Sequence, residues 1–391
     1  MPTDHFKHNQ YAAGAAARAL YVHVPFCLAK CRYCDFYSRP IDASSAQGFV
    51  NAVAAELGLR RDALQPPLES IYVGGGTPSS LEPAMLGRLL GLLSPLAGPD
   101  TEFTVEANPG VLDADRAAAM AAAGVNRVSL GAQSFQQAEL ELLGRLHRVQ
   151  EVPTAVALLR GAGITNLCLD LIYGIPGQTP ESWGDSLERV IELDVQHVSC
   201  YALSFEGGTP LHRQLSEGLV AAMPDELQEQ CYRTAIDRLG RAGFEHYEIS
   251  NWAKPGKWSR HNCTYWRNLP YLGLGPAAAS YVGGVRWVNQ PDLEAYVAAL
   301  SSGSLPPAER EKLENRPQMA ETLMLGLRLL EGVDRAEFAS RFGLDPLDAF
   351  PHSLSNHRGL GTVIITDTHL RLSDRALFVS DSVLADIIAE V

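Results

Sequence analysis

Short apolar runs alternate with longer amphipathic stretches through the first two-thirds of the chain. The runs are rich in Val, Ile and Leu, as is typical of buried strands. They predict six strands, over Leu20–Val24, Ser70–Val73, Glu102–Ala107, Asn126–Leu130, Asn166–Ile172 and His197–Ala202. The amphipathic stretches between them predict helices that connect consecutive strands.

Two of these helices carry clear start signals. Asp113 can cap a helix over Ala114–Ala123, and Thr179 precedes a helix over Glu181–Leu193. Strand–helix alternation implies parallel strands joined by right-handed crossovers. Six such units form either a partial (β/α)6 barrel or a doubly wound open sheet, and periodicity alone does not separate the two.

The fifth predicted strand shows which side chains face the interior. Within Asn166–Ile172, Cys168 and Asp170 share one face and the three leucines share the other. We expect the leucines to meet the outer helices and Asp170 to face inward. In β/α barrels the chemistry gathers at the carboxyl ends of the strands, so the polar residues at these ends are candidate site residues.

The last third of the chain has a different pattern. A helix around Pro224–Ala242 precedes an aromatic-rich, irregular stretch, and helices are predicted over Met319–Glu331 and Asp334–Phe342 before a hairpin at Thr362–Leu372. We therefore divide the chain into a poorly ordered lead-in (1–18), a barrel (19–243), an aromatic-rich segment (244–300), a linker (301–318) and a small, winged-helix-like C-terminal α/β accessory domain (319–391).

Composition narrows the class of protein. The chain has 391 residues, 46% of them hydrophobic, and no apolar run approaches the roughly 20 residues of a membrane span. Its first residues lack a secretory signal pattern. Seven cysteines are too few for a disulfide scaffold and suit a reducing cytoplasm. The net charge of −13 argues against broad nucleic-acid binding.

Three cysteines follow the first strand with C-x3-C-x2-C spacing: Cys27, Cys31 and Cys34. Three soft thiolates in one loop suit zinc or an iron–sulfur cluster. A closed zinc site needs a fourth protein ligand, and only Asp35 is nearby. A [4Fe–4S] cluster on three cysteines leaves one iron open for a small molecule. Three unrelated buried thiols are disfavoured, because charged residues interrupt any apolar face.

Further polar motifs follow the later strands. The run Gly74–Ser79 lets the backbone approach a ligand and present N–H groups to a carboxylate, although alone it would be an ordinary turn. Glu106 ends the third strand facing inward, where it needs either a ligand or a barrel arginine as partner. Gln133, Arg145 and Asp170 lie at or after the next strand ends, and each alone could be a satisfied core group.

Together these motifs resemble the radical S-adenosylmethionine (SAM) superfamily, in the branch that contains oxygen-independent coproporphyrinogen III oxidases and HemW-type haem chaperones. The resemblance runs from about Leu20 to beyond Trp266. It implies a TIM-like partial (β/α)6 barrel and a [4Fe–4S] cluster whose open iron binds the amino and carboxylate groups of SAM. It also implies contacts to SAM, some of them to a second SAM molecule, from Tyr21, Tyr33, Gly75, Gly76, Thr77, Glu106, Gln133, Arg145 and Asp170.

The segment from His261 to Trp266 matches the H-N-x-x-Y-W motif of the haem-chaperone branch. Histidine is a usual axial ligand of haem iron, and aromatic side chains suit a flat macrocycle. Cys263 could supply a thiolate instead. A hydrogen-bonded structural histidine is the alternative for His261.

Two features separate this chain from the oxidases it resembles. The oxidase loop has one more cysteine in a C-x-C ending, where this chain has Cys34-Asp35-Phe36, and only 26 residues precede Cys27. We therefore expect a haem chaperone that passes haem to acceptor proteins, such as haem enzymes of respiration, without coproporphyrinogen III dehydrogenase activity. A dehydrogenase or other radical SAM oxidoreductase is the alternative, and an RNA-modifying enzyme is disfavoured by the acidic charge.

Overall fold

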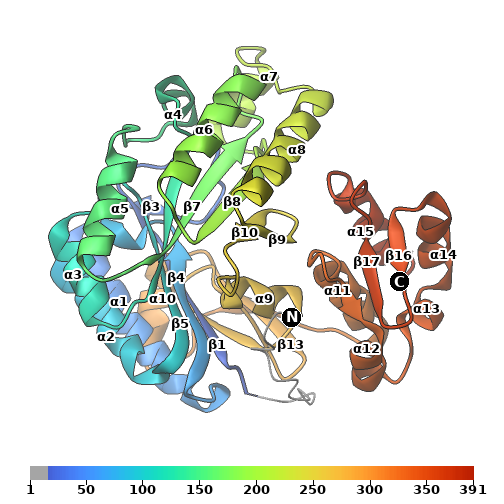
Figure 1. The fold of residues 1–391 in the computed structure, drawn as a ribbon. Coiled ribbons are helices and arrows are strands. Elements are labelled where there is room, and N and C mark those ends of the chain that lie inside the picture. Colours follow the sequence, from blue (N-terminus) through green and yellow to red (C-terminus); the bar gives the residue numbers. More distant parts are fainter. Residues whose placement is uncertain (1–15) are drawn as a thin grey trace.

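The computed structural model describes residues 16–391, and a 12-stranded sheet forms its centre (Figure 1). Six neighbouring strands of this sheet are parallel: β1 (Ala19–Val24), β4 (Leu68–Gly75), β5 (Ala97–Ala107), β6 (Arg127–Gln133), β7 (Asn166–Tyr173) and β8 (His197–Ala202). All six strands expected from the sequence are thus confirmed. The sheet stays open between its edge strands, β9 (Glu245–Glu248) and β14 (Ala308–Lys312), so the barrel is partial.

Side chains on the parallel strands alternate between two environments. Those facing the outer helices are apolar and buried in one continuous core: Leu20, Val22, Ile71, Val73, Phe103, Val105, Val128, Leu130, Leu167, Leu169 and Leu171. Those facing the interior are largely polar: Tyr21, His23, Tyr72, Thr104, Glu106, Arg127, Ser129, Cys168, Asp170, His197 and Ser199. Parallel strands covered on both faces usually read as continuous apolar runs. The alternation therefore marks an interior built for polar groups, and Asp170 faces inward as predicted.

Helices cover the outside of these strands (Figure 1). They are α1 (Ala43–Leu59), α2 (Pro83–Leu93), α3 (Ala114–Ala122), α5 (Glu151–Gly161), α6 (Pro180–Glu192) and α8 (Asp225–Arg241), with the shorter α4 (Gln137–Leu143) and α7 (Pro210–Ser216) near the carboxyl ends of the strands. The predicted caps hold: the side chain of Asp113 accepts from the backbone of Arg116, and Thr179 accepts from that of Ser182.

The aromatic-rich segment is regular, contrary to the prediction. It forms β9 (Glu245–Glu248), β10 (Asn251–Ala253), α9 (Arg260–Trp266), β11 (Tyr271–Leu274), β12 (Ala279–Val282), β13 (Val285–Asn289) and α10 (Leu293–Ser301). β11 pairs with β1 in parallel, whereas β10 pairs with β8 in antiparallel. These strands extend both edges of the parallel sheet. They are only three to five residues long, so their periodicity is weak.

The predicted linker over 301–318 also needs correction, because it contains strand β14 (Ala308–Lys312), which pairs with β13. This edge strand consists mostly of exposed charged residues. Charged side chains on an edge prevent pairing with other chains, and they give the strand the composition of a solvated loop. The predicted lead-in lies, up to residue 15, outside the described residues.

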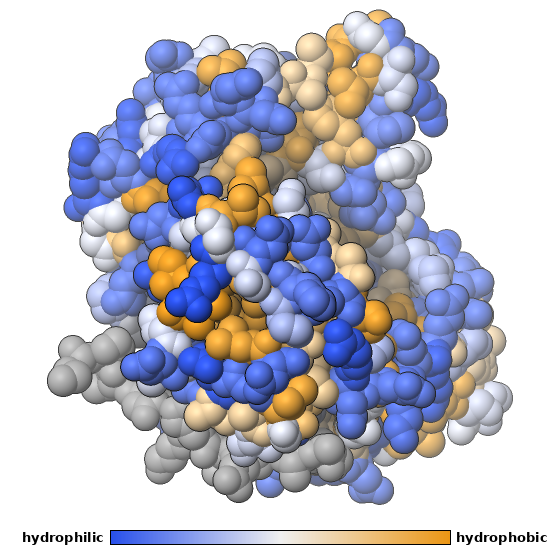
Figure 2. Space-filling view, turned by 90° about the vertical axis from the view of Figure 1, so that its right-hand side faces the viewer, coloured by the Kyte–Doolittle hydropathy of each residue, from blue (hydrophilic) through white to orange (hydrophobic). Residues whose placement is uncertain are grey.

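Residues beyond β14 form a small C-terminal unit. It comprises α11 (Asn315–Gly326), β15 (Val333–Asp334), α12 (Arg335–Phe342), α13 (Pro346–Ala349), α14 (Pro351–Leu360), β16 (Val363–Ile365), β17 (His369–Leu372) and α15 (Ser380–Ala389). The predicted hairpin is present as β16–β17, joined by β15 in a three-stranded sheet. The surface on this side of the molecule is a mosaic of hydrophilic and apolar patches (Figure 2).

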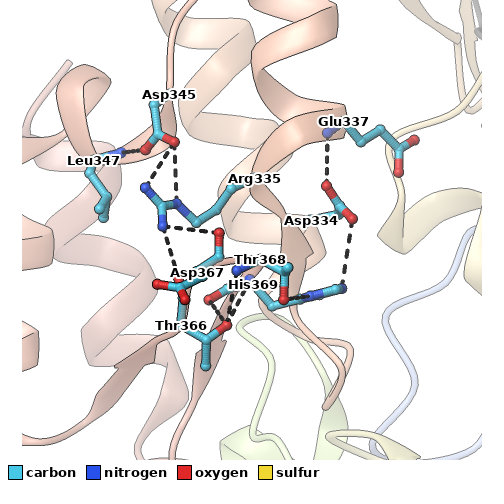
Figure 3. A network of polar contacts seen from close by, with 9 residues as sticks. All are labelled: Asp334, Arg335, Glu337, Asp345, Leu347, Thr366, Asp367, Thr368 and His369. Carbon is cyan, nitrogen blue, oxygen red and sulfur yellow. Dashed lines mark hydrogen bonds and ion pairs between the residues drawn. The ribbon is translucent and has the colours of Figure 1, made fainter.

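A polar network holds the hairpin of this unit to α12 (Figure 3). The guanidinium of Arg335 donates to the carboxylate of Asp345 and, at 2.8 Å, to the backbone carbonyl of Thr366 in the hairpin turn. The carboxylate of Asp334 caps α12 through the backbone N–H of Glu337 at 2.8 Å. One arginine thus joins three chain segments.

Asn268 joins the C-terminal unit to the barrel. Its amide donates to Glu321 and Thr322 of α11 at 3.2 and 3.0 Å, and its backbone carbonyl accepts from Arg341. No helix among residues 16–391 is long and apolar enough to cross a membrane.

Candidate functional site

The three cysteines lie in a loop after the carboxyl end of β1. β2 (Phe26–Cys27) pairs with β3 (Arg39–Pro40) and closes this loop at its base. The middle of the loop is held at Arg32. Its backbone N–H donates to the carbonyl of Leu143, at the end of α4, at 2.9 Å, and its carbonyl accepts from the N–H of Leu211, in α7, at 2.8 Å. The half-buried thiols, all unpaired, are therefore held by backbone contacts at the mouth of the barrel.

Two side chains that can donate hydrogen bonds lie against two of the three sulfurs. The Thr77 hydroxyl lies 3.5 Å from Cys27 Sγ, and Arg145 Nη1 donates to Cys31 Sγ at 3.4 Å. Burial raises the pKa of the Cys34 thiol to about 11, so ionisation of this ligand would accompany iron binding. Donors of this kind stabilise cluster thiolates. The donor set at the loop fits the cluster that the sequence predicts.

The glycine run after β4 packs against this loop, but its N–H groups are already used. Gly76 N–H donates to the carbonyl of Val24 and Thr77 N–H to that of Phe26, at 2.8 and 2.7 Å. A Cβ on Gly76 would lie 2.5 Å from the carbonyl oxygen of Phe26. The N–H groups of Gly76 and Thr77 are thus bonded within the protein, and Gly76 allows close packing between the end of β4 and the cysteine loop.

Glu106 is held inside the barrel by two donors. The Tyr72 hydroxyl donates to Oε1 at 2.7 Å and the Gly75 N–H to Oε2 at 3.1 Å. Burial raises the pKa of Glu106 to about 7, opposed by the bond from Tyr72 and supported by the charge of Asp170. Its hydrogen-bond partners are a tyrosine and a backbone group, where the alternative interpretation expected an arginine.

Asp170 and Arg145 approach the same region from the far wall. Asp170 accepts from the Ser129 hydroxyl at 2.9 and 3.1 Å and from the Cys168 thiol at 3.3 Å. Arg145 Nη2 donates to the carbonyl of Gly131 at 2.5 Å, while its Nη1 reaches Cys31. Arg145 therefore bridges the end of β6 and the cysteine loop.

Gln133 ends β6 at an irregularity in the pairing with β7. Its φ of 64° lies in the left-handed region, which is uncommon for a residue other than glycine. Tyr33 packs on an apolar cluster around Ile172 and Leu203 at the barrel mouth, and burial raises its pKa. Both residues thus lie at the carboxyl ends of the strands.

Tyr21 is tied to the loop through His23. Its hydroxyl lies 3.0 Å from His23 Nδ1, and His23 Nε2 donates at 2.8 Å to the backbone carbonyl of Tyr37. Because Nε2 faces a carbonyl, Nδ1 accepts from Tyr21. Burial lowers the pKa of His23, so the ring is neutral.

The two haem-ligand candidates do not reach the site. His261 is 1% exposed, and its ring nitrogens lie 2.9 Å from the Ser70 hydroxyl and 2.8 Å from the Tyr265 hydroxyl. Cys263 is fully buried against Tyr247 and Leu329. A macrocycle cannot approach either atom in this arrangement, which favours the alternative of a hydrogen-bonded structural histidine for His261. The assignment of His261 or Cys263 as axial ligand stays a prediction.

Several interior residues escaped the sequence prediction. Cys168 Sγ lies 2.9 Å from His197 Nδ1, and His197 Nε2 lies 2.9 Å from the Tyr247 hydroxyl. The buried Arg127 has no hydrogen-bond partner for Nε among the described residues. On β8, Tyr201 is 42% exposed. The alternation of side chains along a strand was used for β7 only. Applied to β6 and β8, it would have identified Arg127, His197 and Tyr201 as inward-facing.

Comparison with known proteins gives matches over most of the chain. A family model described as the radical SAM superfamily matches residues 21–190, and one described as the HemN C-terminal domain matches residues 313–379. The heme chaperone HemW of Bacillus subtilis is 32% identical, over 96% of this chain and 100% of its own length. That of Synechocystis is 39% identical, over 82% of this chain and 80% of its own.

A mitochondrial radical S-adenosyl methionine domain-containing protein 1 from Bos taurus is 33% identical over 97% of this chain and 89% of its own length. Among solved structures, coproporphyrinogen III oxidase (HemN) of Escherichia coli superposes with a TM-score of 0.83 over 98% of this chain and 92% of its own, at 22% identity. At that identity the superposition shows a shared fold.

The raised pKa of Glu106 predicts a pH-dependent stability. The folded state binds this proton more tightly than the unfolded state, whose carboxyl keeps a pKa near 4.5. The free energy of unfolding should therefore fall as pH rises from about 4.5 through 7, by at most about 3 kcal/mol from this group. Urea unfolding of the apoprotein at pH 5 and pH 8 measures this fall. Glu106→Gln should reduce it, and equal falls in variant and wild type would contradict the assignment.

The contact between Arg145 and Cys31 predicts an effect on cluster reduction. A cation that donates to a ligand sulfur stabilises the more negative, reduced cluster. Arg145→Met should therefore lower the reduction potential of the reconstituted cluster by several tens of millivolts, measured by anaerobic potentiometric titration with electron paramagnetic resonance. Arg148→Met, an exposed position on the same segment, is the matched control. An unchanged potential at full iron content would refute the role of Arg145.

Proposed function

The chain belongs to the HemW family within the radical SAM superfamily, and on this premise we propose that it is a haem chaperone that binds a [4Fe–4S] cluster, SAM and haem. It would deliver haem to acceptor proteins, such as haem enzymes of respiration. The observation that carries this proposal is likeness over the full length of a curated haem chaperone, at 32% identity. Unpaired thiols at the barrel mouth suit a reducing compartment, which supports a cytoplasmic location.

Cys27, Cys31 and Cys34 would hold the cluster, whose open iron takes the amino and carboxylate groups of SAM. This group would supply reductive one-electron chemistry to bound SAM. Thr77 and Arg145, which can both donate, lie against ligand sulfurs, and two inward carboxylates, Glu106 and Asp170, lie below the loop. Negative charge there suits the positively charged ammonium and sulfonium groups of SAM. The further SAM contacts that we propose are Tyr21, Tyr33, Gly75, Gly76, Thr77, Gln133 and Arg145.

Haem needs a surface away from the buried His261. The cysteine loop offers exposed apolar side chains in Leu28 and Phe36, and Leu146 follows the arginine that contacts Cys31; Phe36 and Leu146 are each 61% exposed. Exposed cations, Lys30 and Arg32, lie between the cysteines of the same loop. In a chain of net charge −13, this combination complements an apolar macrocycle with two carboxylates. We propose that haem binds on the outer side of the cysteine loop.

One anaerobic experiment separates the chaperone from the alternative enzyme. Reconstituted protein is supplied with haem and, separately, with coproporphyrinogen III, SAM and a reductant. The chaperone should give a Soret band, release haem to an apo-acceptor, and leave coproporphyrinogen III unconverted. Sustained decarboxylation to protoporphyrinogen IX without haem binding would establish the dehydrogenase instead. The likeness to HemN, at 22% identity, supports that alternative only through the fold.

The proposed haem surface can be tested by placing one charge on it. Leu146→Glu should weaken haem binding at least tenfold, because it puts a carboxylate against the macrocycle and near the propionates. Leu360→Glu is the matched control, since Leu360 is 56% exposed but lies on α14 of the C-terminal unit. Haem titration followed by absorbance gives both affinities. Equal affinities for the two variants would place haem elsewhere.

A further inference from the structure

The H-N-x-x-Y-W motif has no role in the proposed haem site, yet its His261 ring contacts side chains of the barrel interior. It forms α9, which packs against β4. The backbone N–H groups of Arg260 and His261 both donate, at 3.1 Å, to the carboxylate of Glu102, which pairs with Ser70 in the β4–β5 register. Ser70, near the start of β4, bonds the His261 ring. The helix therefore closes the barrel at the amino ends of its strands, opposite the cysteines.

The His261 ring is fixed in orientation. Ser70 occupies Nδ1 and Tyr265 occupies Nε2, and the Tyr265 ring stands edge-on to it, with centroids 4.8 Å apart and an angle of 80°. Burial, with the charge of Arg127 in addition, lowers the pKa of His261 to about 3, so the ring is neutral. A neutral ring with both nitrogens bonded is a rigid platform.

Two tyrosines rest on this platform. The Tyr72 ring stacks on His261 with centroids 5.1 Å apart and an angle of 25°, and the Tyr21 ring lies 6.4 Å from it. The two tyrosine rings are 6.2 Å apart. Tyr21 and Tyr72 are direct neighbours in the β1–β4 register, so they form one layer across two strands.

The tyrosine hydroxyls meet the next layer toward the mouth. Tyr72 donates to Glu106, and Tyr21 donates to His23. There is no room for adjustment in this layer. A Cβ on Gly74 would lie 2.7 Å from the Glu106 carboxylate, and one on Gly75 would lie 2.5 Å from the His23 ring. A shift of the tyrosine layer would therefore move Glu106 and His23.

We propose that His261 and Tyr265 are positioning residues of the SAM site, because they set the height and angle of Tyr72 and, through it, the position of the Glu106 carboxylate. This inference rests on SAM binding as part of the proposed function. It gives the motif a role that does not require binding of haem iron. His261 acts on Glu106 through the stacked Tyr72 ring and the hydrogen bond from the Tyr72 hydroxyl, so a substitution can remove either contact separately.

The test measures SAM affinity of the cluster-loaded protein by anaerobic equilibrium dialysis. His261→Ala removes the platform and should weaken SAM binding three- to tenfold. Tyr72→Phe keeps the stacked ring but removes the bond to Glu106, and should cost roughly tenfold. Because both act through Glu106, the double variant should bind like Tyr72→Phe alone. The haem Soret band of His261→Ala should match that of the wild type.

Controls make each outcome decisive. His352→Ala removes an exposed histidine on α14 and should leave SAM affinity unchanged. If His261→Ala does not fold, Tyr265→Phe removes only the hydroxyl on Nε2 and should still weaken SAM binding about two- to threefold. Wild-type SAM affinity in folded variants, additive losses in the double variant, or a Soret band lost with SAM binding intact would each overturn the inference. Absence of SAM binding by the wild type would overturn the proposed function as well.

Discussion

The polar interior of the barrel is the constraint on which the rest of the structure depends. A buried polar group without a partner is costly, and most inward side chains are hydrogen-bonded to a side chain on the neighbouring strand. The resulting contacts are specific: Tyr72 with Glu106, Ser129 with Asp170, and Cys168 with His197. Apolar packing against the helices holds the strands together, whereas these polar pairs define where each strand end lies relative to the next.

The position of the cysteine loop is fixed by contacts with these interior side chains. His23 bonds the loop carbonyl of Tyr37 from below, and Arg145 holds Cys31 from the side. The glycines of β4 let the strand pass close enough for Thr77 to reach Cys27. In the proposed function, Thr77 and Arg145 would contact SAM, and the same two side chains lie against Cys27 and Cys31. Binding of SAM and the state of the cluster would then be coupled through these shared side chains.

Local patterns in the sequence were sufficient for the six parallel strands and for the cysteine loop. Parity predicted the inward direction of Asp170, and spacing predicted a cluster loop, because both depend on neighbouring residues only. The outcome for His261 depended on Ser70, which lies 191 residues away. The sequence of the motif is the same whether the ring nitrogens of its histidine are free to bind a ligand or are hydrogen-bonded within the protein. The edge strand at Ala308–Lys312 was missed for a related reason. Its charged residues reflect exposure to solvent, and they carry no signal for its pairing with β13.

The closed end of the barrel determines from which side a ligand can enter. Because α9 closes the amino ends of the strands around β4 and β5, we expect a ligand to enter at the carboxyl ends, where the cysteine loop lies. The inner side of this loop faces Glu106 and Asp170, and its outer side carries exposed apolar and basic residues. In the proposed function, SAM takes the inner side and haem the outer side. One short loop would then separate the two ligands. A change in the cluster that altered the conformation of this loop would therefore also alter the proposed haem surface.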